Sequence, residues 1–245
     1  MKSRKIVIIK TGETFPSIIP RLGDFEDWIA RGLNLPSQDI QVVDVEAQQP
    51  LPPLDRIKGV VIAGSHAMVT QDLDWSLELE AWIPQLIRKK VPLLGICYGH
   101  QLIARAMGGI VDYHPGGLEI GTTDIDCVFQ GEEDPLFGGL AQRFKAHVVH
   151  SQTVIRLPES SVVIAKNGFE PHHAFRIGPC AWGVQFHPEY DAAIETAYIG
   201  NMTQAIEASG QDPSQVLDQV VETPVAAMVL TRFGILASVS GGSCF

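Results

Sequence analysis

The chain has 245 residues, of which 45% are hydrophobic and 19% charged, and its formal net charge is −10. These values are typical of a globular protein with a full-sized core, and the acidic balance argues against non-specific binding to nucleic acid or to an acidic membrane surface. The longest late apolar stretch (225–230) is too short to span a bilayer and the apolar run near the start (6–9) is too short for a signal peptide, so the sequence predicts a soluble protein.

Strand-like and helix-like segments alternate through the first part of the chain. Short apolar runs predict strands, and the amphipathic stretches between them predict helices. The predicted order is strand 6–9, helix 25–32, strand 41–45, strand 59–63, helix 75–90, strand 91–96 and helix 100–107. This alternation is typical of an α/β fold in which a mostly parallel central sheet carries helices on both faces.

The middle of the chain shows strand signals joined by turns. The predicted strands are 110–113, 119–129, 146–157, 161–166, 173–177 and 181–186. Consecutive strands of this kind indicate an antiparallel extension packed on the parallel core. Helix returns at about 192–209, and a C-terminal helical extension is expected over about 212–236, with Asp212 as its N-cap. No linker or repeat divides the chain, so we expect one domain over residues 1–245.

The most informative segment is a cysteine held between two glycines, Gly-Ile-Cys-Tyr-Gly at 95–99. It lies where a predicted strand gives way at once to a predicted helix. A cysteine at such an elbow sits at the tip of a tight turn and at a helix N-terminus, where free N–H groups and the helix dipole favour the thiolate. Cys97 is therefore a candidate nucleophile. A buried, unreactive cysteine is the alternative, and it is our interpretation of Cys127, Cys180 and Cys244.

A second motif supplies candidate partners for Cys97. The apolar run 181–186 is followed by His187, Pro188 and Glu189. A cysteine nucleophile needs a base, and the base needs a group that fixes its tautomer. His187 and Glu189 are two residues apart, so along an extended chain they point the same way. A core histidine satisfied by backbone groups and a solvated glutamate are the alternatives.

Together the two motifs resemble the class I glutamine amidotransferases, the family with a Cys-His-Glu triad. The runs G-I-C-Y-G-H-Q and G-V-Q-F-H-P-E occur in the family's order and are most similar to those of the amidotransferase domain of GMP synthetase and its free-standing relatives. The resemblance covers about residues 5–200. It implies a flavodoxin-like core, with Cys97 as nucleophile, His187 as base and Glu189 as the residue that orients the base.

The resemblance also implies an oxyanion hole built from backbone N–H groups. The N–H of Tyr98, just after the nucleophile, is one expected donor, and the turn at Gly64 and Ser65 is expected to supply the other. In the family this turn commonly carries two glycines before a proline, whereas here Ser65 replaces the second glycine and His66 replaces the proline. A backbone donor survives a serine, but the departure leaves the geometry of the turn and the identity of the second donor open.

Four residues are expected to hold the amino-acid end of the substrate. Gln101 lies one helical turn past Cys97, so both can face one pocket, and the family uses a glutamine at this place. His150, Ser151 and Gln152 resemble the family's S-H-G-D stretch, whose backbone contacts the substrate, although only His150 matches by identity.

The resemblance implies hydrolysis of the glutamine side-chain amide through a Cys97 thioester, with glutamate and ammonia as products and no organic cofactor. No metal is expected either, since the adjacent His172 and His173 would point to opposite faces of a strand. The chain carries no phosphate-binding loop of the G-x-x-x-x-G-K-[ST] type. A separate synthetase partner would therefore receive the ammonia.

Two alternative functions stay open. A free-standing γ-glutamyl peptidase or hydrolase would use the same carbonyl chemistry on γ-glutamyl amides with a larger leaving amine, and the Gly64-Ser65 turn is shared in part with that branch. A catalytically inactive binding protein on the same fold is the other alternative. The four cysteines contain no C-x-x-C pair and no spacing typical of a disulfide framework, so we expect a reducing, cytoplasmic setting.

Overall fold

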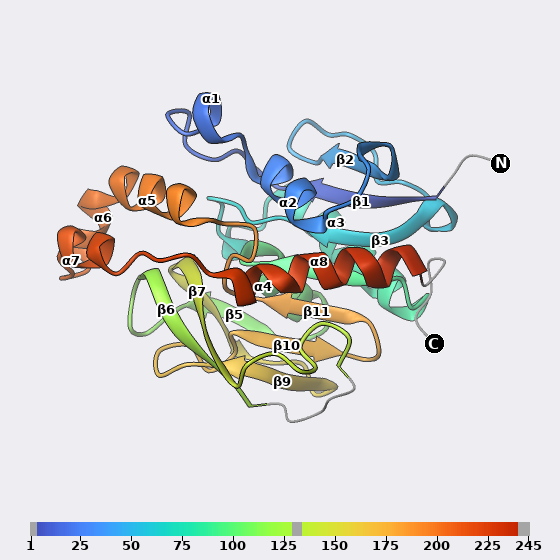
Figure 1. Cartoon of the computed structure of the whole chain (residues 1–245). Coiled ribbons are helices and arrows are strands. Elements are labelled where there is room, and N and C mark those ends of the chain that lie inside the picture. The colour runs from blue at the N-terminus through green and yellow to red at the C-terminus, as the bar shows by residue number, and fades with distance from the viewer. Residues whose placement is uncertain (1–3, 129–133, 240–245) are drawn as a thin grey trace.

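The computed structural model describes residues 4–128 and 134–239 (Figure 1). Its strands are β1 (Lys5–Lys10), β2 (Ile40–Asp44), β3 (Ile57–Ile62), β4 (Leu93–Ile96), β5 (Ile110–Tyr113), β6 (Glu119–Cys127), β7 (Arg143–His150), β8 (Gln152–Arg156), β9 (Ser161–Lys166), β10 (Ala174–Ile177) and β11 (Ala181–Val184). Its α-helices are α1 (Ile19–Leu22), α2 (Phe25–Leu33), α3 (Asp74–Arg88), α4 (Tyr98–Ala106), α5 (Ala192–Asn201), α6 (Thr203–Ala208), α7 (Pro213–Asp218) and α8 (Pro224–Val239).

The parallel half of the main sheet has the strand order of a flavodoxin-like fold. The main sheet runs β2-β1-β3-β4-β11-β10-β9-β6-β7, and its first five strands pair in parallel. In chain order these five are arranged 2-1-3-4-5, which is the flavodoxin arrangement. Side chains are buried on both faces: Ile6 and Ile8 pack in one core cluster and Val7 and Ile9 in another. Burial on both faces explains the unbroken apolar runs of the sequence.

Helices cover both faces of the parallel half (Figure 1). α2 and α8 pack against each other and against one face, while α3 and α4 lie on the other. Gly234 allows the close approach of α8 to α2, because a Cβ there would overlap the carbonyl of Leu33. The C-terminal segment therefore completes one face of the core.

The predicted antiparallel extension is confirmed. From β11 onward the main sheet continues through β10, β9, β6 and β7, and each of these pairs is antiparallel. A second, two-stranded sheet of β5 and β8 lies against α4. The predicted strand 119–129 is shorter in the structure, since β6 ends at Cys127; residue 129 lies outside the described residues.

The single strand predicted at 146–157 is wrong, because the chain divides at Ser151 into β7 and β8. β7 pairs with β6 in the main sheet, whereas β8 pairs with β5 in the small one. The amide of His114 donates to the carbonyl of Ser151 at 2.8 Å and anchors the corner. The break is caused by pairing with segments that are distant in the sequence. No glycine or proline marks it in the sequence.

Two predicted helical segments are also divided. The helix predicted at 192–209 breaks at Met202 (φ −104°, ψ 10°), beside Thr203, whose hydroxyl donates to the carbonyls of Ile199 and Gly200. Such back-bonding by a threonine disturbs a helix. The extension predicted at 212–236 is two helices, α7 and α8, and α8 begins at a proline that disfavours helix in the residue before it.

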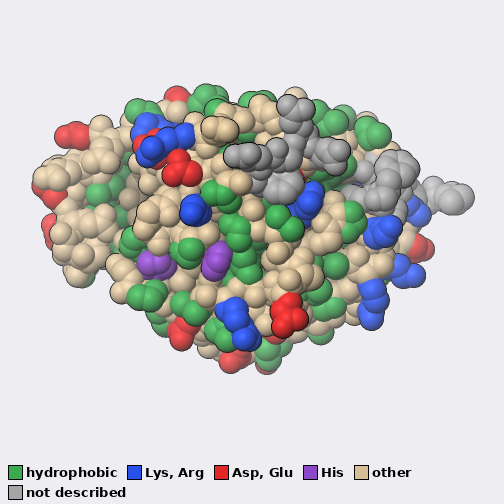
Figure 2. Space-filling model, turned by 90° about the horizontal axis from the view of Figure 1, so that it is seen from below, with side chains coloured by type: hydrophobic (Ala, Val, Ile, Leu, Met, Phe, Trp, Pro, Cys, Tyr) green, Lys and Arg blue, Asp and Glu red, His purple; other side chains and the backbone are tan. Residues whose placement is uncertain are grey.

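Within residues 4–128 and 134–239, every helix is too short or too polar to serve as a membrane span. Figure 2 shows one face of the molecule, on which Lys and Arg side chains lie among Asp and Glu side chains. Positive and negative side chains are therefore mixed on this face, although the net charge of the chain is −10.

Candidate active site

Cys97 sits at a strained elbow between β4 and α4. Its backbone has φ 48° and ψ −96°, a conformation that a residue with a side chain rarely adopts. The flanking glycines are required by close packing: a Cβ at Gly95 would overlap the carbonyl of Gly99, and a Cβ at Gly99 would lie 2.5 Å from the carbonyl oxygen of Ile62. The elbow therefore holds the sulfur at the carboxyl end of the parallel sheet.

The structure brings His187 and Glu189 to Cys97. β11 lies beside β4 with Val184 opposite Ile96, and the amide of Cys97 donates to the carbonyl of Val184 at 2.8 Å. The segment that follows β11 therefore ends next to the elbow, with His187 in hydrogen-bonding reach of the Cys97 sulfur. His187 Nδ1 and Glu189 Oε1 are 2.7 Å apart, and all three side chains are buried.

The surroundings of His187 favour its charged form. Burial lowers the pKa of His187, but the Glu189 carboxylate, the Cys97 sulfur and the hydrogen bonds to both outweigh burial and raise the pKa to about 10. The ring is therefore an imidazolium at neutral pH. An imidazolium beside a sulfur stabilises the thiolate. Tyr190 stacks on the ring with centroids 4.2 Å apart and fixes its plane.

The turn at Gly64 and Ser65 lies against these residues. A Cβ on Gly64 would lie 3.2 Å from Cε1 of His187 and 3.8 Å from Cβ of Cys97, so glycine keeps this approach open. Ser65 does not disrupt the turn, because its hydroxyl accepts a hydrogen bond from the amide of Ala67 at 3.0 Å. Among the described residues, the amides of Gly64, Ser65 and Tyr98 meet no backbone acceptor.

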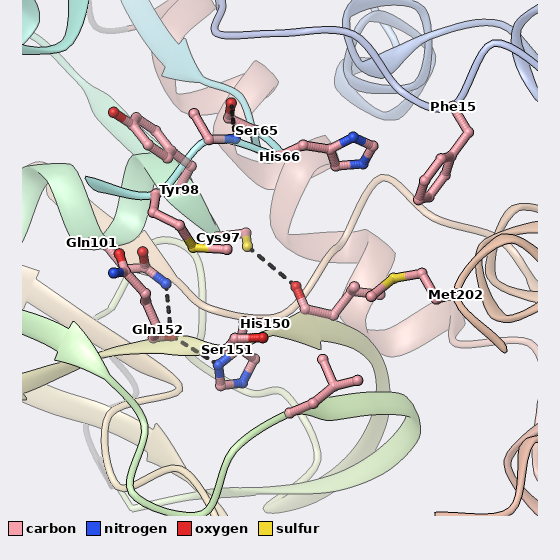
Figure 3. A pocket seen from close by; sticks show the side chains of 14 residues that line it. Phe15, Ser65, His66, Cys97, Tyr98, Gln101, His150, Ser151, Gln152 and Met202 are labelled. Atoms are coloured by element: carbon pink, nitrogen blue, oxygen red, sulfur yellow. Dashed lines mark hydrogen bonds between the residues drawn. The ribbon is translucent and has the colours of Figure 1, made fainter. Parts of the chain in front are cut away.

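The four expected substrate residues line the same cavity of about 320 Å³ as Cys97 (Figure 3). Gln101 donates from Nε2 to the carbonyl of Gln152 at 2.8 Å and to Oε1 of Gln185 at 3.0 Å, so its own oxygen is left to face a ligand. The Gln152 side chain instead reaches away to the hydroxyl of Thr70 at 2.7 Å. Its contribution to the cavity is therefore through its backbone.

His150 is held by Glu119, a buried carboxylate that no sequence motif indicated. Nε2 of His150 lies 2.7 Å from Oε2 of Glu119, and Nδ1 lies 3.0 Å from the carbonyl of Gln152. Burial raises the pKa of Glu119, but hydrogen bonds to His150 and His173 outweigh burial and hold it well below its usual range. Both ring nitrogens of His150 therefore face an acceptor oxygen. The two partners are 31 residues apart, and no local pattern marks the pair.

The residues on the far side of the sulfur were not predicted from the sequence either. Phe15, His66 and Met202 line the cavity there, and Figure 3 shows Cys97 between these three and Gln101. They come from three separate parts of the chain. A departure from the family pattern at His66 was the one available signal.

The remaining cysteines and acidic groups form no disulfide and no metal-binding cluster in the described part of the chain. Cys127 and Cys180 are free thiols, and Cys244 lies outside the described residues. Within residues 4–128 and 134–239, no three or more His, Cys, Asp or Glu side chains are grouped to hold a metal ion.

Comparison with known proteins identifies relatives along most of the chain. The family model of class I glutamine amidotransferases matches residues 22–203. The chain is 37% identical over 150 residues to the glutamine-hydrolyzing GMP synthase of Porphyromonas gingivalis. The aligned region covers 60% of this chain and 28% of that protein. It is 40% identical over 143 residues to a glutamine-hydrolyzing GMP synthase subunit of Ignicoccus hospitalis, covering 57% of this chain and 71% of that relative.

Other relatives are named for a different activity or share the fold. Over 144 residues the chain is 32% identical to γ-glutamyl peptidase 3 of Arabidopsis thaliana, and the aligned region covers 58% of each protein. A glutamine amidotransferase of Thermotoga maritima superposes with a TM-score of 0.74 at 21% identity, covering 96% of this chain and 97% of that one. The chain spans only 28% of the length of the P. gingivalis relative. Since the family model matches well over half of its residues, the chain belongs to the class I glutamine amidotransferases.

Proposed function

We propose that this chain hydrolyses the γ-amide of glutamine through a thioester on Cys97. The observation that carries the proposal is the placement of the buried His187 ring between the Cys97 sulfur and the Glu189 carboxylate at the carboxyl end of the parallel sheet. Such a group can hold a thiolate ready and then donate a proton to a leaving amine.

In the first half of the proposed reaction, the Cys97 thiolate attacks the γ-carbonyl carbon. The carbonyl oxygen becomes an oxyanion, and the free amides of Tyr98 and of the Gly64-Ser65 turn are suited to stabilise it. The imidazolium of His187 gives its proton to the nitrogen as the C–N bond breaks, so ammonia leaves and a γ-glutamyl thioester stays on the sulfur.

In the second half, water replaces the amine. Neutral His187 takes a proton from water, the hydroxide attacks the thioester carbon, and the C–S bond breaks to release glutamate. The thiolate and the imidazolium are restored, so no metal or organic cofactor takes part. Glu189 holds the ring in one orientation and supports its charged form at both stages.

The polar side of the cavity is suited to the amino-acid end of the substrate. The free oxygen of Gln101 can accept from an α-ammonium group, and the corner formed by His150, Ser151 and Gln152 offers backbone groups to the α-carboxylate and α-amino group. The Glu119–His150 pair fixes this corner, because Nδ1 of His150 donates to the Gln152 carbonyl.

We further propose that a synthetase partner receives the ammonia and that the protein works in the reducing cytoplasm. The first part is supported by the likeness to the GMP synthase subunit of I. hospitalis. The second is supported by the three described free thiols, one of which is the nucleophile of this proposal.

A second candidate substrate class is the larger γ-glutamyl amides. The favouring observation is that the cavity continues past Cys97 to Phe15 and Met202, beyond the reach of a bare carboxamide. The likeness to γ-glutamyl peptidase 3 of A. thaliana points the same way.

One panel tests these proposals. The purified chain is incubated with glutamine and, separately, with γ-glutamyl dipeptides, and released glutamate is measured. We expect release that Cys97→Ser abolishes, while Cys180→Ser retains it. Release from dipeptides but not from glutamine would favour the peptidase. Absence of release from every γ-glutamyl compound, with and without cell extract, would refute both and favour an inactive binding protein.

A further inference from the structure

The cavity beside Cys97 is polar on one side and apolar on the other. Gln101 and the corner 150–152 line the polar side, and Phe15 and Met202 line the apolar side (Figure 3). A γ-glutamyl group carries its α-amino and α-carboxylate charges at the end remote from the amide. These charges need the polar side, so the amine of the scissile amide extends toward the other.

The position of His187 agrees with placing the leaving amine on the apolar side, because His187 must protonate the leaving nitrogen. Tyr190 stacks on His187, and its ring centroid is 5.1 Å from that of Tyr198. The Tyr198 ring in turn lies 5.2 Å from Phe15 and 5.9 Å from His66. One continuous aromatic layer therefore runs from the proton donor to the apolar side of the cavity.

His66 presents a neutral surface within this layer. Its Nε2 is 3.2 Å from the Tyr198 hydroxyl, which itself accepts from the hydroxyl of Thr14 at 2.8 Å. The Tyr198 proton is thus available to Nε2, which leaves the ring proton of His66 on Nδ1. Burial lowers the pKa of His66; Asp24 opposes this effect in part and the charge of His187 adds to it. His66 therefore offers an N–H donor without a positive charge.

The cavity offers no charged partner for a leaving group beyond the reacting pair. Its described lining contains no Asp, Glu, Lys or Arg side chain, and both ring nitrogens of His150 already bond to Glu119 and Gln152. Against Phe15 and Met202, a cationic amine or an amine that carries a carboxylate would lose its hydration with neither an ion pair nor the polar groups of the opposite side. An uncharged apolar amine would instead remove apolar surface from water.

We propose that Phe15, His66 and Met202 form a leaving-group subsite that selects γ-glutamyl amides of uncharged apolar amines, alkyl or aryl. The inference rests on the proposed amide hydrolysis and names its substrate class. The Cys97 thiolate forms the C–S bond, His187 protonates the nitrogen, the C–N bond breaks, and a neutral amine RNH₂ leaves in place of ammonia. Water then cleaves the thioester, so γ-glutamyl amide and water give glutamate and RNH₂.

The test compares substrates that differ only in the substituent on nitrogen. Glutamate release is measured for γ-glutamyl methylamide, γ-glutamyl benzylamide, γ-glutamylphenylalanine and glutamine. We expect kcat/KM for the benzylamide to exceed that for the methylamide at least tenfold, and to exceed that for γ-glutamylphenylalanine, whose carboxylate finds no cation. Phe15→Ala and, independently, Met202→Ala should each reduce the benzylamide-to-methylamide ratio at least threefold. Tyr113→Ala removes an exposed aromatic ring outside the cavity and should leave that ratio unchanged.

Binding to Cys97→Ala, measured by calorimetry, separates this inference from the proposed hydrolysis. Tighter binding of the benzylamide than of the methylamide, lost in Phe15→Ala, supports the subsite even if the wild type turns over none of the compounds. Turnover of glutamine with equal or weaker use of the benzylamide would overturn the subsite while leaving amide hydrolysis intact. That result would instead make the apolar side an exit for ammonia.

Discussion

Replacing Glu189 by glutamine tests the electrostatic basis of the site most directly. The Glu189 charge is the largest of the contributions that raise the pKa of His187 to about 10. With a neutral amide in its place, we expect this pKa to fall, since a nearby opposite charge shifts a pKa by about 1–3 units. A fall of about two units, the middle of that range, corresponds to about 2.7 kcal/mol, or about a hundredfold loss of imidazolium stabilisation. The imidazolium exists below its pKa and is lost as pH rises through it, so activity should disappear at lower pH in the variant.

The measurement is kcat/KM for glutamate release between pH 6 and 11, which reports the ionisations of the free enzyme. In the wild type the basic limb should lie near pH 10, and in Glu189→Gln it should move to lower pH by about 1–3 units. Glu207→Gln removes an exposed carboxylate on α6 and should keep the wild-type profile. If the basic limb stayed in place when Glu189 lost its charge, the carboxylate would not be what holds the proton on His187.

Three further predictions concern stability. Gly95→Ala should lower the free energy of unfolding, measured by urea titration, by about 3 kcal/mol and should abolish activity, because a Cβ there overlaps the backbone of the following helix. The control Gly200→Ala, at an open position, should show neither effect. Glu119→Gln should cost about 3–5 kcal/mol by breaking the buried Glu119–His150 pair, and should raise KM more than it lowers kcat. Burial raises the pKa of Glu195 to about 8, above its unfolded value, so the wild type should lose stability as pH rises from about 4.5 to 8. Glu195→Gln should remove this loss, about 2–4 kcal/mol between unfolding measured at pH 5 and at pH 8; equal slopes in the two proteins would contradict the assignment.

The parts of the fold that the sequence predicts are those whose signal is local. Strands β1, β3 and β4 are buried on both faces and therefore appear as unbroken apolar runs. The division at Ser151 was missed because its cause is not local, and the division at Met202 was missed because one threonine that bonds back to the helix is a weak signal in a sequence. Ser151 turns where β8 leaves one sheet to pair with β5 in another, and this pairing partner is distant in the sequence.

The candidate site divides in the same way. Cys97 and His187 are recognisable because each follows an apolar run that forms a parallel strand, and the neighbouring positions of β4 and β11 then bring the two together. The Glu119–His150 pair and the His66–Tyr198 hydrogen bond join residues 31 and 132 positions apart. Nothing at either partner indicates the other, so only the folded chain reveals them.

The departure from the family pattern at Ser65 and His66 does not favour an inactive protein. A family turn with a second glycine and a proline is kept in place by the stiffness of the proline. Here two hydrogen bonds restrain the turn instead: Ser65 accepts from the amide of Ala67, and His66 bonds to the hydroxyl of Tyr198. The turn still packs on His187 through Gly64, with its amides unpaired among the described backbone groups. The turn therefore keeps the open amides that the proposed hydrolysis requires, and the substitution acts on the shape of the cavity, because Ser65 and His66 line it.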